Sequence, residues 1–107
     1  MKEICISELN PSYTAILELD KLLTEKGIKH ELARLYDGYI IYYPNEEGRV
    51  GDVIEHEGGY GHNHNLMEAY GFKECRGDII PNLTVDEALE LFENAANIRR
   101  NVRHTAF

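Results

Sequence analysis

The 107-residue sequence lacks the features that would place it in a membrane or cross-link it. Its longest aliphatic runs are two or three residues, far below the roughly 20 needed to cross a bilayer. Residues 1–6 contain no long apolar stretch of the kind found in a secretion signal. Only two cysteines occur, Cys5 and Cys75, so no disulfide framework is expected. These absences predict a protein of a reducing cytoplasm, with both thiols free and buried.

Basic residues are also scarce, because 11 lysines and arginines face 19 aspartates and glutamates, a net charge of −8. Three of the arginines lie in the segment 99–107, which has no acid, so residues 1–98 carry a net charge of −11. Such a body repels phosphate and argues against direct nucleic-acid binding. It suits a partner with a basic surface, although acidity of this kind also simply keeps proteins soluble.

The remaining composition is that of an ordinary globular chain, with 43% hydrophobic and 28% charged residues. We therefore expect one domain over residues 1–107, with 99–107 as a basic tail. The first predicted helix covers 11–26, with Asn10 and Pro11 at its start and Gly27 at its end. Its apolar positions recur at helical spacing.

The middle of the chain predicts a three-stranded antiparallel meander. Segments 29–35 and 39–43 flank Asp37-Gly38, a dipeptide suited to a tight hairpin turn. A second turn over 44–48 leads to a third strand over 49–56, and Ile4-Cys5-Ile6 could add an edge strand. Strand alternation puts Tyr39, Ile41 and Tyr43 on one sheet face and Ile40 and Tyr42 on the other.

Two more helices are predicted after the meander. Asn65 and Glu68 form a capping pattern for a short helix that ends at Gly71. Thr84 and Glu87 form a second capping box, ahead of the apolar stripe of a C-terminal helix. A short strand around 78–80 is also compatible with the sequence. The predicted fold is therefore α+β, with the first and last helices packed on one sheet face.

Several segments resemble a family of small acidic proteins encoded by phages and prophages of Gram-positive bacteria. The likeness covers most of 17–93 and is carried by residues 19–23, 36–39, 43–44, 52–62, 66–68 and 83–88. Its most recognisable piece is Val53-Ile54-Glu55-His56-x-Gly58-x-Tyr60-Gly61. This chain departs from the family pattern at Gly59, where serine is usual, and over 67–72. The resemblance implies a viral context, in which small proteins often antagonise host defence.

The segment 55–64 concentrates the reactive side chains. His56, His62 and His64 could offer three imidazoles to a metal ion, as in a metal-dependent hydrolase, although their spacing matches no known metal signature. Exposed loop histidines are the simpler interpretation. Alternatively, Gly58, Gly59 and Gly61 between a strand and a helix could hold the phosphate of a signalling nucleotide. A compact structural loop explains the same glycines.

We expect binding rather than catalysis, with no cofactor, because no nucleophile or paired-carboxylate motif stands out. The expected function is inhibition of a host defence factor, in the manner of an acidic anti-CRISPR inhibitor of a nucleic-acid-binding protein. The candidate binding residues are Tyr42, Glu46, Glu47, Glu55, Glu57, Gly58, Gly59, Tyr60, Gly61, His62 and Asn65. Tyrosines are favoured at protein interfaces, although core packing accounts for many of them.

Overall fold

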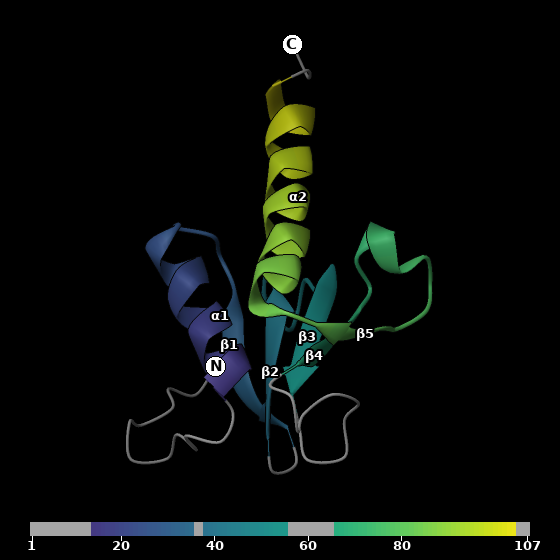
Figure 1. Ribbon diagram of the computed structural model, residues 1–107. Coiled ribbons are helices and arrows are strands. Elements are labelled where there is room, and N and C mark those ends of the chain that lie inside the picture. The colour runs from purple at the N-terminus through teal and green to yellow at the C-terminus, as the bar shows by residue number, and fades with distance from the viewer. Residues whose placement is uncertain (1–13, 36–37, 56–65, 105–107) are drawn as a thin grey trace.

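The structure, a computed structural model, describes residues 14–35, 38–55 and 66–104, and these form an antiparallel sheet with two α-helices (Figure 1). The strands follow one another in the order β1-β2-β3-β4-β5. Their bounds are β1 Glu31–Leu35, β2 Gly38–Tyr43, β3 Gly51–Glu55, β4 Met67–Tyr70 and β5 Ile80–Leu83. The helices are α1 Thr14–Glu25 and α2 Val85–His104, with a short 3₁₀ helix, η3, over Lys73–Cys75. The α+β prediction is confirmed at this level, with five strands rather than three.

Helix α1 ends as its sequence predicts. Gly27 adopts a φ of +68°, and the Ile28 N–H donates to the Leu23 carbonyl at 3.0 Å. This pair of features closes the last turn and folds Ile28 back onto the helix. The predicted start at Asn10 and Pro11 lies outside the described residues. Within them, the Ile16 N–H donates to the Glu55 carboxylate at 3.2 Å. A side chain from β3 thus stabilises the first turn of the helix.

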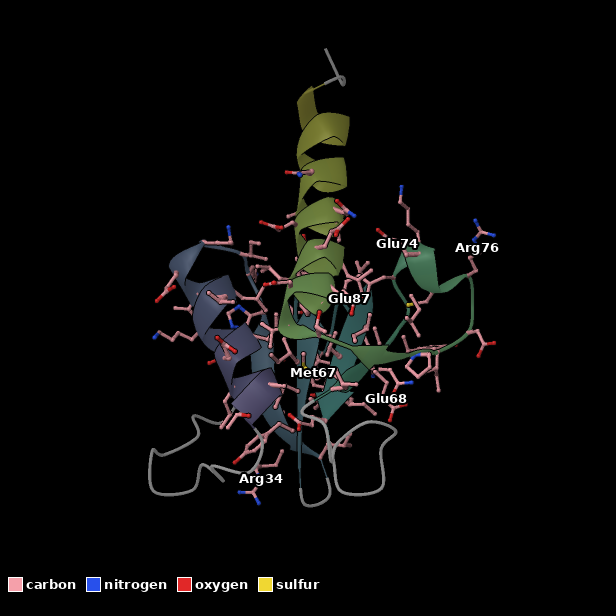
Figure 2. All side chains as sticks on the ribbon, viewed as in Figure 1. Arg34, Met67, Glu68, Glu74, Arg76 and Glu87 are labelled. Carbon is pink, nitrogen blue, oxygen red and sulfur yellow. The ribbon has the colours of Figure 1, made fainter. Side chains whose placement is uncertain are left out.

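Helix α2 begins with the predicted capping box. The Thr84 N–H donates to Glu87 Oε1 at 2.9 Å, and the Glu87 N–H donates to Thr84 Oγ1 at 3.2 Å. These hydrogen bonds lower the pKa of the Glu87 carboxyl, which is labelled at the base of α2 in Figure 2. From this start the helix runs on past the sheet, and its C-terminal part projects away from the other elements (Figure 1).

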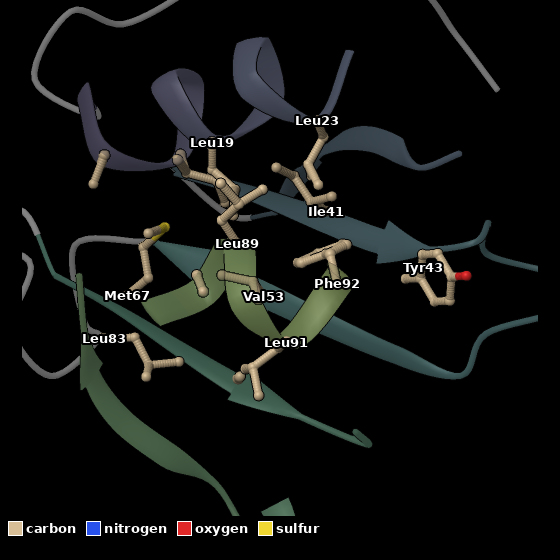
Figure 3. Close-up of a cluster of buried hydrophobic side chains, with 14 of the residues drawn as sticks. Leu19, Leu23, Ile41, Tyr43, Val53, Met67, Leu83, Leu89, Leu91 and Phe92 are labelled. Atoms are coloured by element: carbon tan, nitrogen blue, oxygen red, sulfur yellow. The ribbon is translucent and has the colours of Figure 1, made fainter. Parts of the chain in front are cut away.

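Both helices pack on one face of the sheet, and a single apolar core lies between the two layers (Figure 3). The helices contribute Leu19, Leu23, Leu89, Leu91 and Phe92, which face sheet residues such as Ile41, Val53 and Met67. Tyr39, Ile41 and Tyr43 share one sheet face, as predicted, and that face is the one in the core.

The segment after the predicted glycine-rich loop differs from the prediction. Residues 67–70 form strand β4 and not a short helix, because Met67 and Ala69 point into the core while the residues between and after them point outward. The alternation pairs β4 with β3 on one side and β5 on the other. Tertiary pairing has overridden a local capping pattern. Gly38 also differs, since it is the first residue of β2 and pairs with Leu35 rather than lying inside the turn.

An aromatic cluster closes one end of the core. The Phe72 ring lies 5.1 Å from the Phe92 ring and 6.4 Å from the Tyr43 ring, measured between centroids. Phe72 also covers Gly51, where an added Cβ would lie 2.7 Å from the ring. The absence of a side chain at Gly51 therefore lets Phe72 sit flat on β3.

Replacing Gly51 with alanine should destabilise the protein by about 1–3 kcal/mol, because the methyl group would overpack the Phe72 ring. Urea unfolding followed by circular dichroism measures the change. The matched control is the same substitution in a Phe72→Leu background, where the smaller side chain can yield. An equal cost of Gly51→Ala in both backgrounds would show that the ring contact is not its cause.

The turn between α1 and β1 holds a histidine with two acceptors. Nδ1 of His30 lies 2.8 Å from the Ile28 carbonyl oxygen, and Nε2 lies 2.8 Å from Asp20 Oδ1. A neutral imidazole can donate to only one of them, whereas the protonated ring donates to both. Burial opposes the charge, but the hydrogen bonds to Asp20 and Ile28 and the Asp20 charge outweigh it and raise the pKa of His30 above 6.5.

The contact between His30 and Asp20 should make the free energy of unfolding depend on pH near neutrality. Because the folded pKa lies above the unfolded value, the contribution is fully present below pH 6.5 and is lost as pH rises through the folded pKa. We expect Asp20→Asn to destabilise the protein by roughly 1 kcal/mol at pH 6 and by less at pH 8.5. Urea unfolding of both proteins at the two pH values tests this. A destabilisation that does not change with pH would argue against a charged His30.

Candidate functional site

The face of the sheet opposite the helices carries two rows of cross-strand neighbours, which we call the open face. One row contains Glu31, Tyr42, Asp52 and Tyr70, and the other contains Ala33, Ile40, Ile54 and Glu68. The first row consists of polar and aromatic residues. The second row consists of apolar residues and ends at the carboxylate of Glu68. Each row is continuous because the side chains of directly paired residues lie next to each other on one face.

Two side chains of the first row, Tyr42 and Asp52, hold an arginine from the turn before β3. The Arg49 guanidinium carbon lies 4.9 Å from the centre of the Tyr42 ring, and its Nη1 lies 3.2 Å from Asp52 Oδ2. Burial raises the pKa of Asp52, while the hydrogen bond and charge of Arg49 oppose that rise. Burial and then the Glu46 charge raise the pKa of Tyr42. The effect of desolvation on the pKa of Asp52 is therefore larger than the opposing effect of the Arg49 cation.

The second row ends in a small pocket of about 90 Å³. It is lined by Asp52, Ile54, Glu68, Ala69, Tyr70 and Ile79. Glu68 is only 7% exposed, yet no donor or cation in the described ranges bonds to its carboxylate. No side-chain oxygen in that part of the chain is both fully buried and unpaired. The Glu68 oxygens therefore open onto the pocket.

Exposed apolar side chains gather around the same pocket. In the part of the chain that the structure describes, three large hydrophobic residues are exposed, namely Val50 (44%), Tyr70 (50%) and Ile79 (49%). Tyr70 and Ile79 line the pocket. Val50 immediately precedes β3, and its carbonyl lies against Gly71, the residue after Tyr70. Exposed apolar surface that is concentrated at one place and rimmed by charge is typical of an interaction site.

The structure separates the predicted binding residues. Tyr42 and Glu46 lie at the open face, where the Glu46 N–H donates to Glu31 Oε1 at 2.8 Å, and Glu47 is exposed in the adjacent turn. Glu55 lies elsewhere, because it is 2% exposed, faces the core side and accepts the Ile16 N–H. Its carboxylate supports α1 and is not part of an exposed acidic surface.

The other predicted residues lie outside the described ranges. They are His56, Glu57, Gly58, Gly59, Tyr60, Gly61, His62, His64 and Asn65, together with the Ile4-Cys5-Ile6 strand. Within residues 14–35, 38–55 and 66–104, no three potential ligands come together for a metal ion. The anion-binding hypothesis required a helix N-terminus after the glycine-rich segment. Residues 67–70 form strand β4 instead, so this requirement is not met.

Sequence reasoning missed Glu68, Tyr70 and Ile79 as site residues. The available signal was the alternation of Met67, Glu68, Ala69 and Tyr70, which is the period of a half-buried strand. The capping pattern of Asn65 and Glu68 favoured a helix over the same residues. Ile79 gave no signal, because its position depends on how the segment between η3 and β5 folds back along β4.

Comparison with models of protein families, with curated proteins and with solved structures finds no match to this chain. The described residues also include no helix with the length and apolar character needed to span a membrane. Function must therefore be argued from the open face itself.

The described cysteine does not have the properties of a nucleophile. Cys75 is a free thiol at the end of η3 and is packed into the core. Burial raises the pKa of its thiol, and the Glu74 and Asp52 charges add to that rise against a backbone hydrogen bond. Because the thiolate is the reactive form, this position favours an inert thiol.

Cys75 should therefore resist modification in the folded protein. In a Cys5→Ser background, we expect Ellman's reagent to react with Cys75 at pH 8 at least about tenfold more slowly than in 6 M urea, because of burial and the raised pKa of the thiol. Absorbance at the thionitrobenzoate band measures both rates. Equal rates would place the thiol at an accessible position and revive a catalytic reading.

Proposed function

We propose that this protein acts by binding a basic protein surface through its open face, and not by catalysis. The observation that carries the proposal is the position of the exposed Tyr70 and Ile79 beside the carboxylates of Asp52 and Glu68, in one pocket. Apolar and aromatic contacts would supply the affinity, and the carboxylates would select a cationic partner. The helices cover the opposite face. On the open face Ile40, Asp52 and Glu68 are only 5–7% exposed, so a partner would contact it mainly through the exposed Tyr70 and Ile79.

The charge of the whole chain supports a basic partner. The net charge is −8, and exposed acids such as Glu46 and Glu47 flank the open face next to Glu31. Arg49, which lies over Tyr42 of the first row, is already bonded to Asp52. A surface of this sign attracts cationic proteins over a distance and repels phosphate.

The class of partner that fits best is a nucleic-acid-binding protein of a bacterial host, such as an RNA-guided nuclease of a defence system. Such proteins carry positive grooves that an acidic protein could occupy in place of nucleic acid. The resemblance to phage-encoded acidic proteins supports the same context. In this role the protein would be a competitive, non-enzymatic inhibitor in the host cytoplasm.

The proposal is tested by capturing the partner from a Gram-positive host lysate and measuring binding by surface plasmon resonance. Tyr70→Ser and Ile79→Ser should each weaken binding roughly tenfold or more, mainly through faster dissociation, because they remove exposed apolar anchors. Purified partner should lose nucleic-acid cleavage or binding when the wild-type protein is added. Undiminished binding by both variants would place the contact elsewhere.

Charge reversal supplies a matched comparison. Glu46→Lys with Glu47→Lys should slow association, and raised ionic strength should slow it further, because exposed charges are screened over about 8 Å at physiological salt. Glu18→Lys with Glu90→Lys changes the net charge equally but lies on the helices. Equal effects from both pairs, or association that does not depend on salt, would contradict an electrostatic contact at the open face.

A further inference from the structure

The pocket at the end of the second row has the size of one side-chain terminus. Its volume is about 90 Å³, whereas sites for nucleotides and other small molecules usually enclose about 300–1,000 Å³. Its two carboxylates, Asp52 and Glu68, are too few to hold a metal ion, and the described residues contain no group of three ligands. A single inserted side chain is the occupant that these dimensions allow.

Glu68 identifies the charge of that occupant. A carboxylate that is more than nine-tenths buried normally has a cationic or hydrogen-bonding partner, because desolvation without one is costly. In the described ranges Glu68 has none. Arg49, the arginine that reaches the pocket lining, is bonded to Asp52 and not to Glu68, and Arg34 and Arg76 lie away from Glu68 (Figure 2). A cation or strong donor from a binding partner would satisfy this carboxylate, which no described residue does.

The neighbouring row shows how a cation can be held on this face. Arg49 stacks on the Tyr42 ring and bonds to Asp52. Tyr70 is the next residue along that row, paired directly with Asp52, and it stands beside Glu68 at the pocket. Tyr70 and Glu68 thus repeat the combination of aromatic ring and carboxylate, with the arginine absent.

The walls of the pocket suit the stem of a long cationic side chain. Ile54 and Ile79 provide apolar surface beside the two carboxylates. Asp52 and Glu68 are diagonal neighbours on paired strands, at a typical separation of about 7–8 Å between Cα atoms, so both can reach one cation. An arginine buries its methylene stem on apolar surface while its charged end reaches polar groups.

We propose that this pocket receives one arginine side chain of the basic partner, with its guanidinium bonded to Glu68 and stacked on Tyr70. The inference rests on the proposed function, since it names the partner group that the open face recognises. Arginine suits the site better than lysine, because its planar group can bond a carboxylate through two N–H groups and stack on a ring at once.

The test uses the whole protein, labelled with ¹⁵N, and a capped Gly-Arg-Gly peptide as the probe. We expect saturable amide shifts at residues 52–54, 68–70 and 79, with affinity in the millimolar range for one side chain. The matching peptide with citrulline, a neutral analogue of arginine, should bind at least about tenfold more weakly, because the charge-assisted bond is lost. Equal binding of the two peptides overturns the inference.

Two variants and one control assign the effect to Glu68. Glu68→Gln should weaken binding of the arginine peptide roughly tenfold or more, whereas Glu90→Gln, which removes the same charge from exposed α2, should leave it unchanged. Ile79→Arg offers an internal cation and should block the peptide while the fold is kept, so the test survives if Glu68→Gln fails to fold. Unchanged peptide binding in Ile79→Arg overturns the inference.

The two proposals can fail separately. If Tyr70→Ser releases the captured partner but Glu68→Gln and Ile79→Arg do not, the open face is the contact and the arginine pocket is wrong. If the arginine peptide binds through Glu68 but no basic protein is bound, the arginine pocket is confirmed and the proposed function is wrong.

Discussion

A single register across β2, β3 and β4 determines both faces of this protein. Ile41 pairs with Val53 and Val53 pairs with Ala69, and all three point into the core. The same register aligns Tyr42, Asp52 and Tyr70 on the other side. A slip of one residue in this register would turn the core side chains to solvent, and the side chains that form the two rows would no longer be neighbours. Packing of the core therefore fixes the geometry of the open face, where Ile40, Asp52 and Glu68 are themselves buried.

The predictions that succeeded relied on signals that act over a few residues. Gly27 ends α1 and the Thr84–Glu87 pair begins α2, because the required hydrogen bonds are local and the residue types that form them are few. The faces of β2 were also predictable, because strand alternation is fixed by covalent geometry. These elements gave the α+β class and the two-layer arrangement before any tertiary contact was known.

The predictions that failed required knowledge of long-range pairing. The pattern of Asn65 and Glu68 is compatible with a helix start, but the chain instead pairs 67–70 with β3, where Ala69 meets Val53. Ile79 reaches the pocket only because the 3₁₀ helix and β5 return the chain along β4. The candidate site was therefore predicted only in part, through Tyr42 and the acids of the second turn, and its pocket was not.

The hydrogen bond between the Ile16 N–H and the Glu55 carboxylate joins groups 39 residues apart in the chain. During synthesis, the residues of α1 leave the ribosome well before the carboxylate that satisfies its first turn. A short isolated helix of this length is only marginally stable in water. We therefore expect α1 to become stable only after β3 has formed, because Glu55 of β3 accepts the Ile16 N–H.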